Sequence, residues 1–253
     1  MGNINNDNNL SNLKEKWKEA TRFEGYGHDY YYIKEYEKAS ESHLKASEIF
    51  KEISSISKND MKIRAKRNYF IEYGNYLQCK ASHQFYTVKN YKMAQDLFER
   101  AAEQLKEASK IKTDNLNDKK ELDILNMNIH FLLEKASIAK AFYLINKEIK
   151  DYNELIEQFK LASTHDDLEA DFAAQVGDIQ RVSRARARKY YCEGQIFRFK
   201  GMMALQNNEI KKAKEYYLHA SEFFDKSSKL DNEWDEYEKM AKKMLNVAKR
   251  LKE

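Results

Sequence analysis

The sequence predicts an all-α fold, and three observations support this class. The 253-residue chain contains no proline and seven glycines, whereas an average chain of this length carries roughly a dozen prolines. Apolar residues recur at intervals of three and four, which is the period of an amphipathic helix. Short polar segments separate these stretches and supply helix caps. All-β folds and most α/β folds are therefore excluded, because their turns depend on proline and glycine.

The apolar period and the polar breaks together predict the helices in chain order. The breaks contain Asn, Asp, Ser or Thr, which favour helix ends; they are Ser57–Asp60, Lys89–Asn90, Thr113–Asn115, Ser163–Asp167, Gln206–Asn208 and Asp231–Asn232. The predicted helices are 11–33, 36–57, 60–87, 90–112, 116–148, 151–163, 167–206, 209–230 and 232–251. Gly177 is a further candidate break, because 167–206 is long for one straight helix.

An internal repeat places a small residue 12 residues before an alanine, with a second alanine 7 residues later. Its copies are Gly27–Ala39–Ala46, Ser82–Ala94–Ala101 and Gly201–Ala213–Ala220, with a weaker copy at Tyr143–Leu155–Ala162. A ring follows the middle position of each copy by four residues, at His43, Phe98, Phe159 and Tyr217. Small residues let two antiparallel helices approach closely, and the rings are expected to fill the space beside them. This position assigns His43 a packing role in the core or in a groove.

This arrangement resembles the tetratricopeptide repeat, whose signature has Gly-x2-Tyr followed by Ala-x3-Phe. Gly27-x2-Tyr30 with Ala39, and Ala94-x3-Phe98, match it in part, whereas the initial Trp and the terminal Pro are missing. The middle positions of successive copies lie 55, 61 and 58 residues apart, so the helices are longer than those of the ordinary repeat.

Long-helix relatives of this style include the soluble NSF attachment proteins, the 14-3-3 family and microtubule-interacting-and-trafficking modules. The resemblance covers about 20–230. It implies a right-handed solenoid of about four long antiparallel hairpins, TPR-like, with 233–253 as a C-terminal capping helix.

Composition and charge limit the class of protein and its location. A net charge of +4 is small for a dedicated nucleic-acid binder, and no stretch approaches the ~18 apolar residues of a membrane span. Residues 1–10 lack the charged and apolar regions of a secretory signal; they are expected to form a flexible tail before a single repeat domain at 11–253. Cys79 and Cys192 can form one disulfide, but reduced thiols in a cytoplasmic protein are the simpler interpretation.

No catalytic, cofactor or metal motif is present in the sequence. There is no phosphate-binding loop, no GxSxG and no HExxH. The six histidines are scattered, and Glu215-x3-His219 does not have the Glu-x-x-His spacing of a di-iron helix bundle. We therefore expect no enzymatic activity, no cofactor and no bound metal.

Arginine is concentrated in one segment, since five of the ten arginines fall between 181 and 198 while lysine, at 35, is the common base elsewhere. Steps of three and four place six residues on one helical stripe, which we call the arginine stripe: Arg181, Arg184, Arg188, Tyr191, Gln195 and Arg198. Guanidinium groups bind carboxylates and phosphates bidentately. The stripe is therefore a candidate partner-binding site for an acidic or phosphorylated peptide, or for a C-terminal carboxylate. The alternatives are a solvated face, or pairing with the nearby carboxylates Asp166, Asp167, Glu169, Asp171 and Asp178.

Three functions follow from these features. The first is a protein–protein interaction scaffold or adaptor whose groove captures a peptide or helix. The second is binding of RNA or single-stranded nucleic acid through the same stripe, which the small net charge disfavours. The third is a small-molecule-binding helical bundle. The tyrosines near the stripe (Tyr190 and Tyr191) and near Gly27 (Tyr26, Tyr30, Tyr31 and Tyr32) either contribute to a binding surface or fill gaps between helices.

Overall fold

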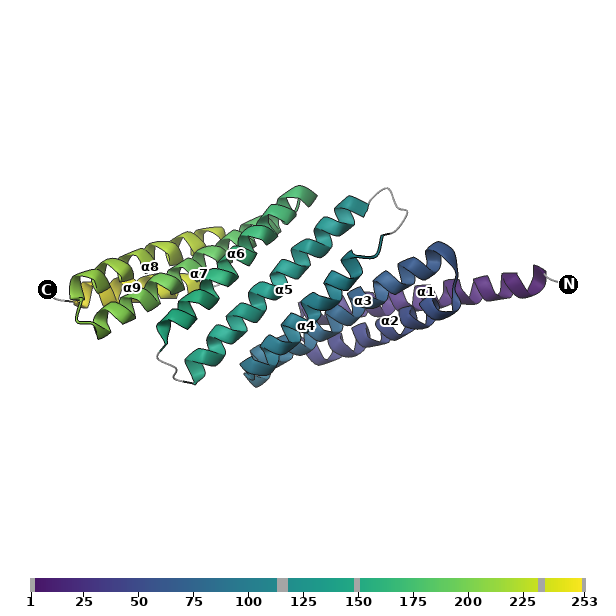
Figure 1. Cartoon of the computed structure of the whole chain (residues 1–253), viewed down its shortest axis with the longest axis horizontal. Coiled ribbons are helices and arrows are strands. Elements are labelled where there is room, and N and C mark those ends of the chain that lie inside the picture. The colour runs from purple at the N-terminus through teal and green to yellow at the C-terminus, as the bar shows by residue number, and fades with distance from the viewer. Residues whose placement is uncertain (1–2, 113–117, 148–150, 232–234, 252–253) are drawn as a thin grey trace. The chain divides into compact units, whose positions relative to one another are not determined.

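The computed structural model describes residues 3–112, 118–147, 151–231 and 235–251, and these contain helices and no strand (Figure 1). The elements in order are α1 (Asn3–Tyr32), α2 (Tyr36–Ile56), α3 (Asn59–Ser82), the π-helix η1 (His83–Val88), α4 (Tyr91–Ser109), α5 (Asp118–Asn146), α6 (Tyr152–Val176), α7 (Ile179–Gln206), α8 (Ile210–Leu230) and α9 (Asp235–Arg250). The prediction of an all-α fold is confirmed for the described residues. None of the helices in these ranges is both long and apolar enough to cross a membrane.

The chain divides into two compact units, Met1–Leu132 and Leu133–Glu253, with the division inside α5. In the first unit α1 packs on α2, α2 on α3, and α3 on α4. In the second unit α6 packs on α7, α7 on α8, and α8 on α9. Packing between successive helices is what a helical repeat requires. A single domain over 11–253 stays a prediction.

One predicted break is wrong, because α6 continues through Ser163–Asp167. The polar side chains there do not cap a helix end: Thr164 donates a hydrogen bond to the carbonyl of Lys160 within the helix, and Asp166 is fully buried. The chain breaks instead at Gly177, the other candidate, where φ is +84°. Asp178 then caps α7 by accepting a hydrogen bond from the backbone N–H of Arg181.

Two further differences from the predicted helices go beyond boundary shifts of one to three residues. α1 begins at Asn3 rather than near Ser11. The predicted helix 60–87 ends as an α-helix at Ser82 and continues as the π-helix η1 to Val88. A π-helix accommodates an extra residue in the backbone, and here it precedes Lys89, whose φ is +64°.

Four interhelical turns share one design, in which a residue with positive φ precedes the N-cap of the next helix. The residues with positive φ are Lys34, Lys89, Gly177 and Asn208. Three of these turns are Schellman motifs, in which the two N–H groups after the helix bond back to its last carbonyls. In the turn after α6, for example, Gly177 bonds to Ala174 and Asp178 to Ala173. Lys34, Lys89 and Asn208 each lie seven residues after the small residue of a repeat copy, which explains the step of 12 residues in those three copies.

Close contacts between small residues and rings confirm the packing expected from the repeat. A Cβ atom added to Gly27 would lie 2.5 Å from the His43 ring, and one added to Gly201 would lie 3.0 Å from the Tyr217 ring. His43 is buried, and its Nδ1 lies 2.7 Å from a carboxylate oxygen of buried Glu72. Both hairpins therefore depend on a glycine facing a ring. His43 has the packing role that its repeat position predicted.

Candidate functional site

The arginine stripe runs along α7, and its two ends meet different surroundings within the second unit. Towards the N-terminus Arg181 and Arg188 turn into a group of carboxylates. Arg184 is exposed. Towards the C-terminus Tyr191, Gln195 and Arg198 line a pocket. The stripe predicted as one surface is thus divided between an ion-pair cluster and a pocket.

Arg188 lies at the centre of the ion-pair cluster. Its Nε donates to Asp166 at 3.0 Å, its Nη2 bonds to Glu169, and its Nε lies 3.8 Å from Glu134 of α5. Arg181 donates from Nε to Glu169 at 2.7 Å. These contacts tie α5, α6 and α7 together through groups that are largely buried. For Arg181 and Arg188 the structure shows pairing with carboxylates of the same chain, one of the alternatives left open by the sequence.

Burial and mutual repulsion shift the pKa values of the cluster. Burial, and next the charge of Glu134, raise the pKa of Asp166 well above its ordinary value, although Arg188 opposes the shift. Burial acts to lower the pKa of Arg188, but the surrounding carboxylates raise it above its ordinary value. Burial and Asp166 also raise the pKa of the Cys192 thiol. The cluster therefore keeps Arg188 charged and Cys192 protonated, which suits a structural ion network.

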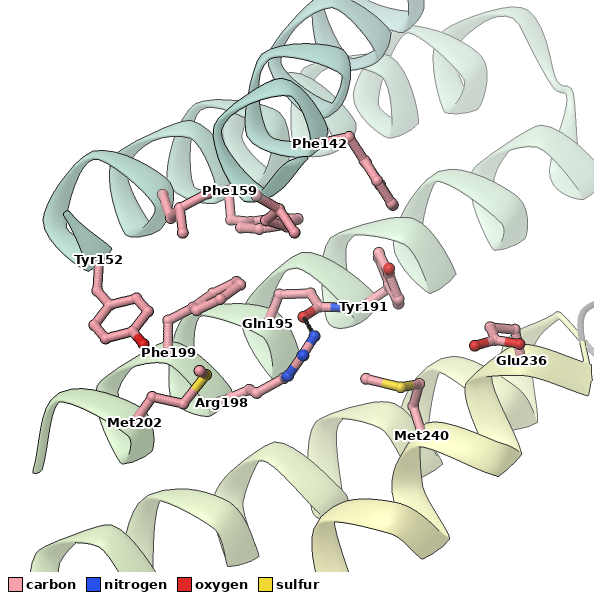
Figure 2. A pocket seen from close by; sticks show the side chains of 12 residues that line it. Phe142, Tyr152, Phe159, Tyr191, Gln195, Arg198, Phe199, Met202, Glu236 and Met240 are labelled. Atoms are coloured by element: carbon pink, nitrogen blue, oxygen red, sulfur yellow. Dashed lines mark hydrogen bonds between the residues drawn. The ribbon is translucent and has the colours of Figure 1, made fainter. Parts of the chain in front are cut away.

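A pocket of about 520 Å³ opens beside the C-terminal half of the stripe (Figure 2). α7 contributes five of the twelve lining residues, more than any other helix, and the remainder come from α5, α6 and α9; we call this the α7 pocket. The lining residues are Phe142, Ile145, Tyr152, Leu155, Phe159, Tyr191, Gln195, Arg198, Phe199, Met202, Glu236 and Met240. The lining is mostly aromatic or aliphatic, with few polar groups, as in typical ligand-binding pockets.

Arg198 is the cation of this pocket. Its Nη1 donates a hydrogen bond of 3.0 Å to Oε1 of Gln195, drawn as a dashed line in Figure 2, and its guanidinium lies 5.2 Å from the centre of the Phe199 ring. Among the residues that the structure describes, no carboxylate pairs with Arg198. Gln195 is buried and holds the guanidinium from one side. The cation is thus positioned in an apolar setting, where an added anion would interact strongly.

Tyr191 closes the pocket near α9. Its ring lies 5.7 Å from that of Phe224 and 5.5 Å from that of Tyr237. Burial raises the pKa of Tyr191 to about 12, so the phenol stays protonated at neutral pH. Tyr190 packs on Phe223 at 6.2 Å. Both tyrosines fill gaps between helices, and Tyr191 also presents a face to the pocket.

The tyrosines near Gly27 differ in their surroundings. Tyr31 contacts Ser82 through its hydroxyl at 3.2 Å and is partly buried. Tyr32 is 87% exposed. Packing is therefore the role seen for Tyr31, while Tyr32 faces solvent.

Residues outside α7 complete the pocket, and the sequence pointed to some of them only as packing residues. Phe159 occupies the ring position of the weak repeat copy, and this periodicity was the available signal. Phe142, Glu236 and Met240 have no distinguishing local pattern. They reach the pocket because α5 and α9 lie on either side of α7 in Figure 2.

The described ranges contain no group of three His, Cys, Asp or Glu side chains arranged to hold a metal ion. The thiols of Cys79 and Cys192 are buried and unbridged. No protein-family model matches the chain, and a search of the curated proteins finds no significant match. A function for this protein therefore has to be inferred from its own residues.

Proposed function

We propose that this protein is a non-enzymatic interaction scaffold, an adaptor that binds an acidic and apolar segment of a partner protein in the α7 pocket. One observation carries the proposal: Arg198 lies in a largely apolar pocket without a carboxylate partner in the described part of the chain. A segment that brings a carboxylate to the guanidinium and apolar side chains to the rings would satisfy both features.

The scaffold that we propose is a right-handed, TPR-like solenoid of about four hairpins, with α9 as its cap. The shared turn design, the small-residue contacts and the packing of successive helices support it. In such a repeat alternate helices line one face. α5, α7 and α9 are alternate helices that contribute to the pocket, and α6, which lies between α5 and α7 in the chain, contributes Tyr152, Leu155 and Phe159 as well.

The arginine stripe then has two roles. Tyr191, Gln195 and Arg198 contact the partner, and exposed Arg184 adds positive charge on the same stripe. Arg181 and Arg188 hold α5, α6 and α7 in place around the pocket. Free buried thiols are consistent with the cytoplasmic location that we propose.

Binding of acidic peptides to wild type and to charge-reversal variants tests this function. We would select peptides from a random display library on wild-type protein and measure their dissociation constants by fluorescence polarisation. Arg198→Glu should weaken binding at least tenfold, because it replaces attraction by repulsion at the carboxylate site. Arg186→Glu is the matched control, since Arg186 is exposed on the same helix and outside the pocket. Equal binding to wild type and Arg198→Glu would contradict the proposal.

A small molecule with a carboxylate is the second candidate for the pocket, because 520 Å³ lies within the range of about 300–1,000 Å³ found for small-ligand sites. A library of carboxylic acids, screened by thermal shift on the same two variants, separates the candidates. A stabilisation that Arg198→Glu abolishes, together with failure of every peptide, would favour this second function.

A further inference from the structure

Resting on the proposed function, we infer that the occupant of the α7 pocket is an α-helical segment of about three turns, and not an extended peptide. The inference names the conformation of the bound segment and the charged residues that it carries. Three observations support it: the length of the floor, the hydrogen-bonding capacity of the walls, and the positions of the charged side chains.

The floor of the pocket follows one face of α7 from Tyr191 to Met202. Tyr191, Gln195, Arg198 and Met202 are separated by the steps of three and four that define one side of a helix, and Phe199 lies beside Arg198. At 1.5 Å per residue this face is about 16 Å long, which is three turns. A helix of about 11 residues matches this length, and so does an extended segment of about five residues.

Hydrogen bonding discriminates between these two conformations. An extended segment needs partners for nearly every N–H and C=O that it buries, and each one left unsatisfied costs about 1–3 kcal/mol. The lining residues all lie on helices, and backbone groups in helix interiors bond to one another. Only the terminal turns that contain Ile145, Tyr152 and Glu236 therefore offer backbone partners to a bound segment. The polar side chains that line the pocket are Tyr152, Tyr191, Gln195, Arg198 and Glu236, and the amide oxygen of Gln195 already accepts from Arg198. A helix satisfies its own backbone and needs from the pocket only apolar contact and charge pairing.

The charged side chains define what the bound helix carries. Arg198 lies on the floor, and exposed Glu236 lies on α9 across the pocket, one turn before Met240 (Figure 2). In the described part of the chain neither is engaged in an ion pair. A helix with Asp or Glu facing Arg198 and Lys or Arg facing Glu236 complements both. Beside these charges, Leu, Phe or Met side chains of the bound helix contact the half-buried lining residues Phe142, Tyr152 and Met202.

Two synthetic peptide pools test the inference. The first has a helix-inducing frame of alanine and α-aminoisobutyric acid, and the second has proline at every third residue, which prevents a helix. Both carry Leu, Phe, Met, Glu and Lys at the same number of randomised positions. Peptides recovered on wild-type protein are then measured individually, by fluorescence polarisation, against wild type, Arg198→Glu and Arg186→Glu.

We expect binders from the helical pool alone, with Glu selected at one position. Arg198→Glu should weaken them at least tenfold, Glu236→Lys should weaken those that carry Lys, and Arg186→Glu should leave them unchanged. An unconstrained analogue should gain helical signal in its far-ultraviolet circular dichroism on binding. Circular dichroism and melting temperature of each protein variant verify that it is folded.

The possible failures are distinguishable. If the proline pool yields Arg198-dependent binders and the helical pool yields none, the bound conformation is extended, and the inference is wrong while the proposed function stands. If neither pool yields a binder that depends on Arg198, and a fully random library also fails, the proposed function itself is wrong.

Discussion

The two halves of α7 carry one stripe of residues and use it differently. In the N-terminal half Arg188 is enclosed by Asp166, Glu169 and Glu134, so its charge is balanced within the chain. In the C-terminal half Arg198 faces aromatic rings and a neutral amide. The comparison shows that helical spacing assigns residues to a common face, while the neighbouring helices decide whether a charge on that face stabilises the fold or remains available to a ligand.

Replacing each arginine by methionine should give the largest contrast. Arg188→Met leaves three buried carboxylates without their central cation, and loss of one partner of a buried ion pair typically lowers the free energy of unfolding by about 3–5 kcal/mol. Arg198→Met should lower it by less than about 1 kcal/mol, because the residue has no ion pair in the described structure and water can reach the pocket. Urea denaturation measures both. If both variants lost the same free energy of unfolding, the proposed difference between the two halves of α7 would be wrong.

The C-terminal half should instead be sensitive to added volume. A Cβ atom at Gly194 would lie 2.7 Å from the ring of Phe224, which is fully buried. Gly194→Ala should therefore lower the free energy of unfolding by about 1–3 kcal/mol. Gly25→Ala is the control, since nothing lies within 4 Å of its added Cβ, and the change should raise helix stability by about 0.5–1 kcal/mol. A Gly194→Ala protein as stable as wild type in thermal unfolding would show that this contact relaxes freely.

The ion-pair cluster at the N-terminal half of α7 should make stability depend on pH, in addition to Glu24, whose pKa burial raises to about 7. The raised pKa of Asp166 means that the folded state binds a proton that the unfolded state has already released above about pH 4. Stability therefore falls as pH rises from about 4 towards the folded pKa, by at most about 1.4 kcal/mol per pH unit. Asp166 faces Glu134, Glu169, Arg188 and Lys135, which contribute to the shift.

Asp166→Asn should flatten this fall, measured by urea denaturation between pH 4 and 8. Asp167→Asn provides the control, because Asp167 is half-exposed and pairs with Lys189. The assignment to Asp166 would be lost if both variants kept the wild-type slope.

The turns at the two ends of α7 should give the smallest effects. Gly177, before α7, has φ +84°, and Gly177→Ala should lower the free energy of unfolding by about 1 kcal/mol. Asn208, after α7, tolerates its φ of +57°, so Asn208→Gly should change the free energy of unfolding by only a few tenths of a kcal/mol.

Lys34, in the turn between α1 and α2, adopts a positive φ less readily than glycine does. Lys34→Gly should therefore raise the free energy of unfolding by about 0.5–1 kcal/mol, which a higher melting temperature would reveal. A destabilising Lys34→Gly would show that its side chain makes a compensating contact.

Most of the fold followed from local signals in the sequence. The apolar period predicted the helices, and the repeat predicted that Gly27 and Gly201 face the rings of His43 and Tyr217. The misplaced break at Ser163–Asp167 has a tertiary cause. Its polar residues resemble caps locally, but Asp166 is buried against Arg188, 22 residues further along the chain.

The candidate site was predictable only in part. The stripe selected Tyr191, Gln195 and Arg198, because helical spacing is local information. Glu236 and Met240 carry no signal that relates them to α7, and they enter the pocket through the packing of α9.

By itself the sequence determined that the chain is helical, where most of its helices begin and end, and which residues share a face, because these properties depend on spacing and on local backbone preferences. It is the packing of the helices that brings carboxylates to Arg188 and, among the described residues, none to Arg198. The reason is physical: the free energy of a charge depends on the groups within a few ångströms of it, and those groups come from helices distant in the chain.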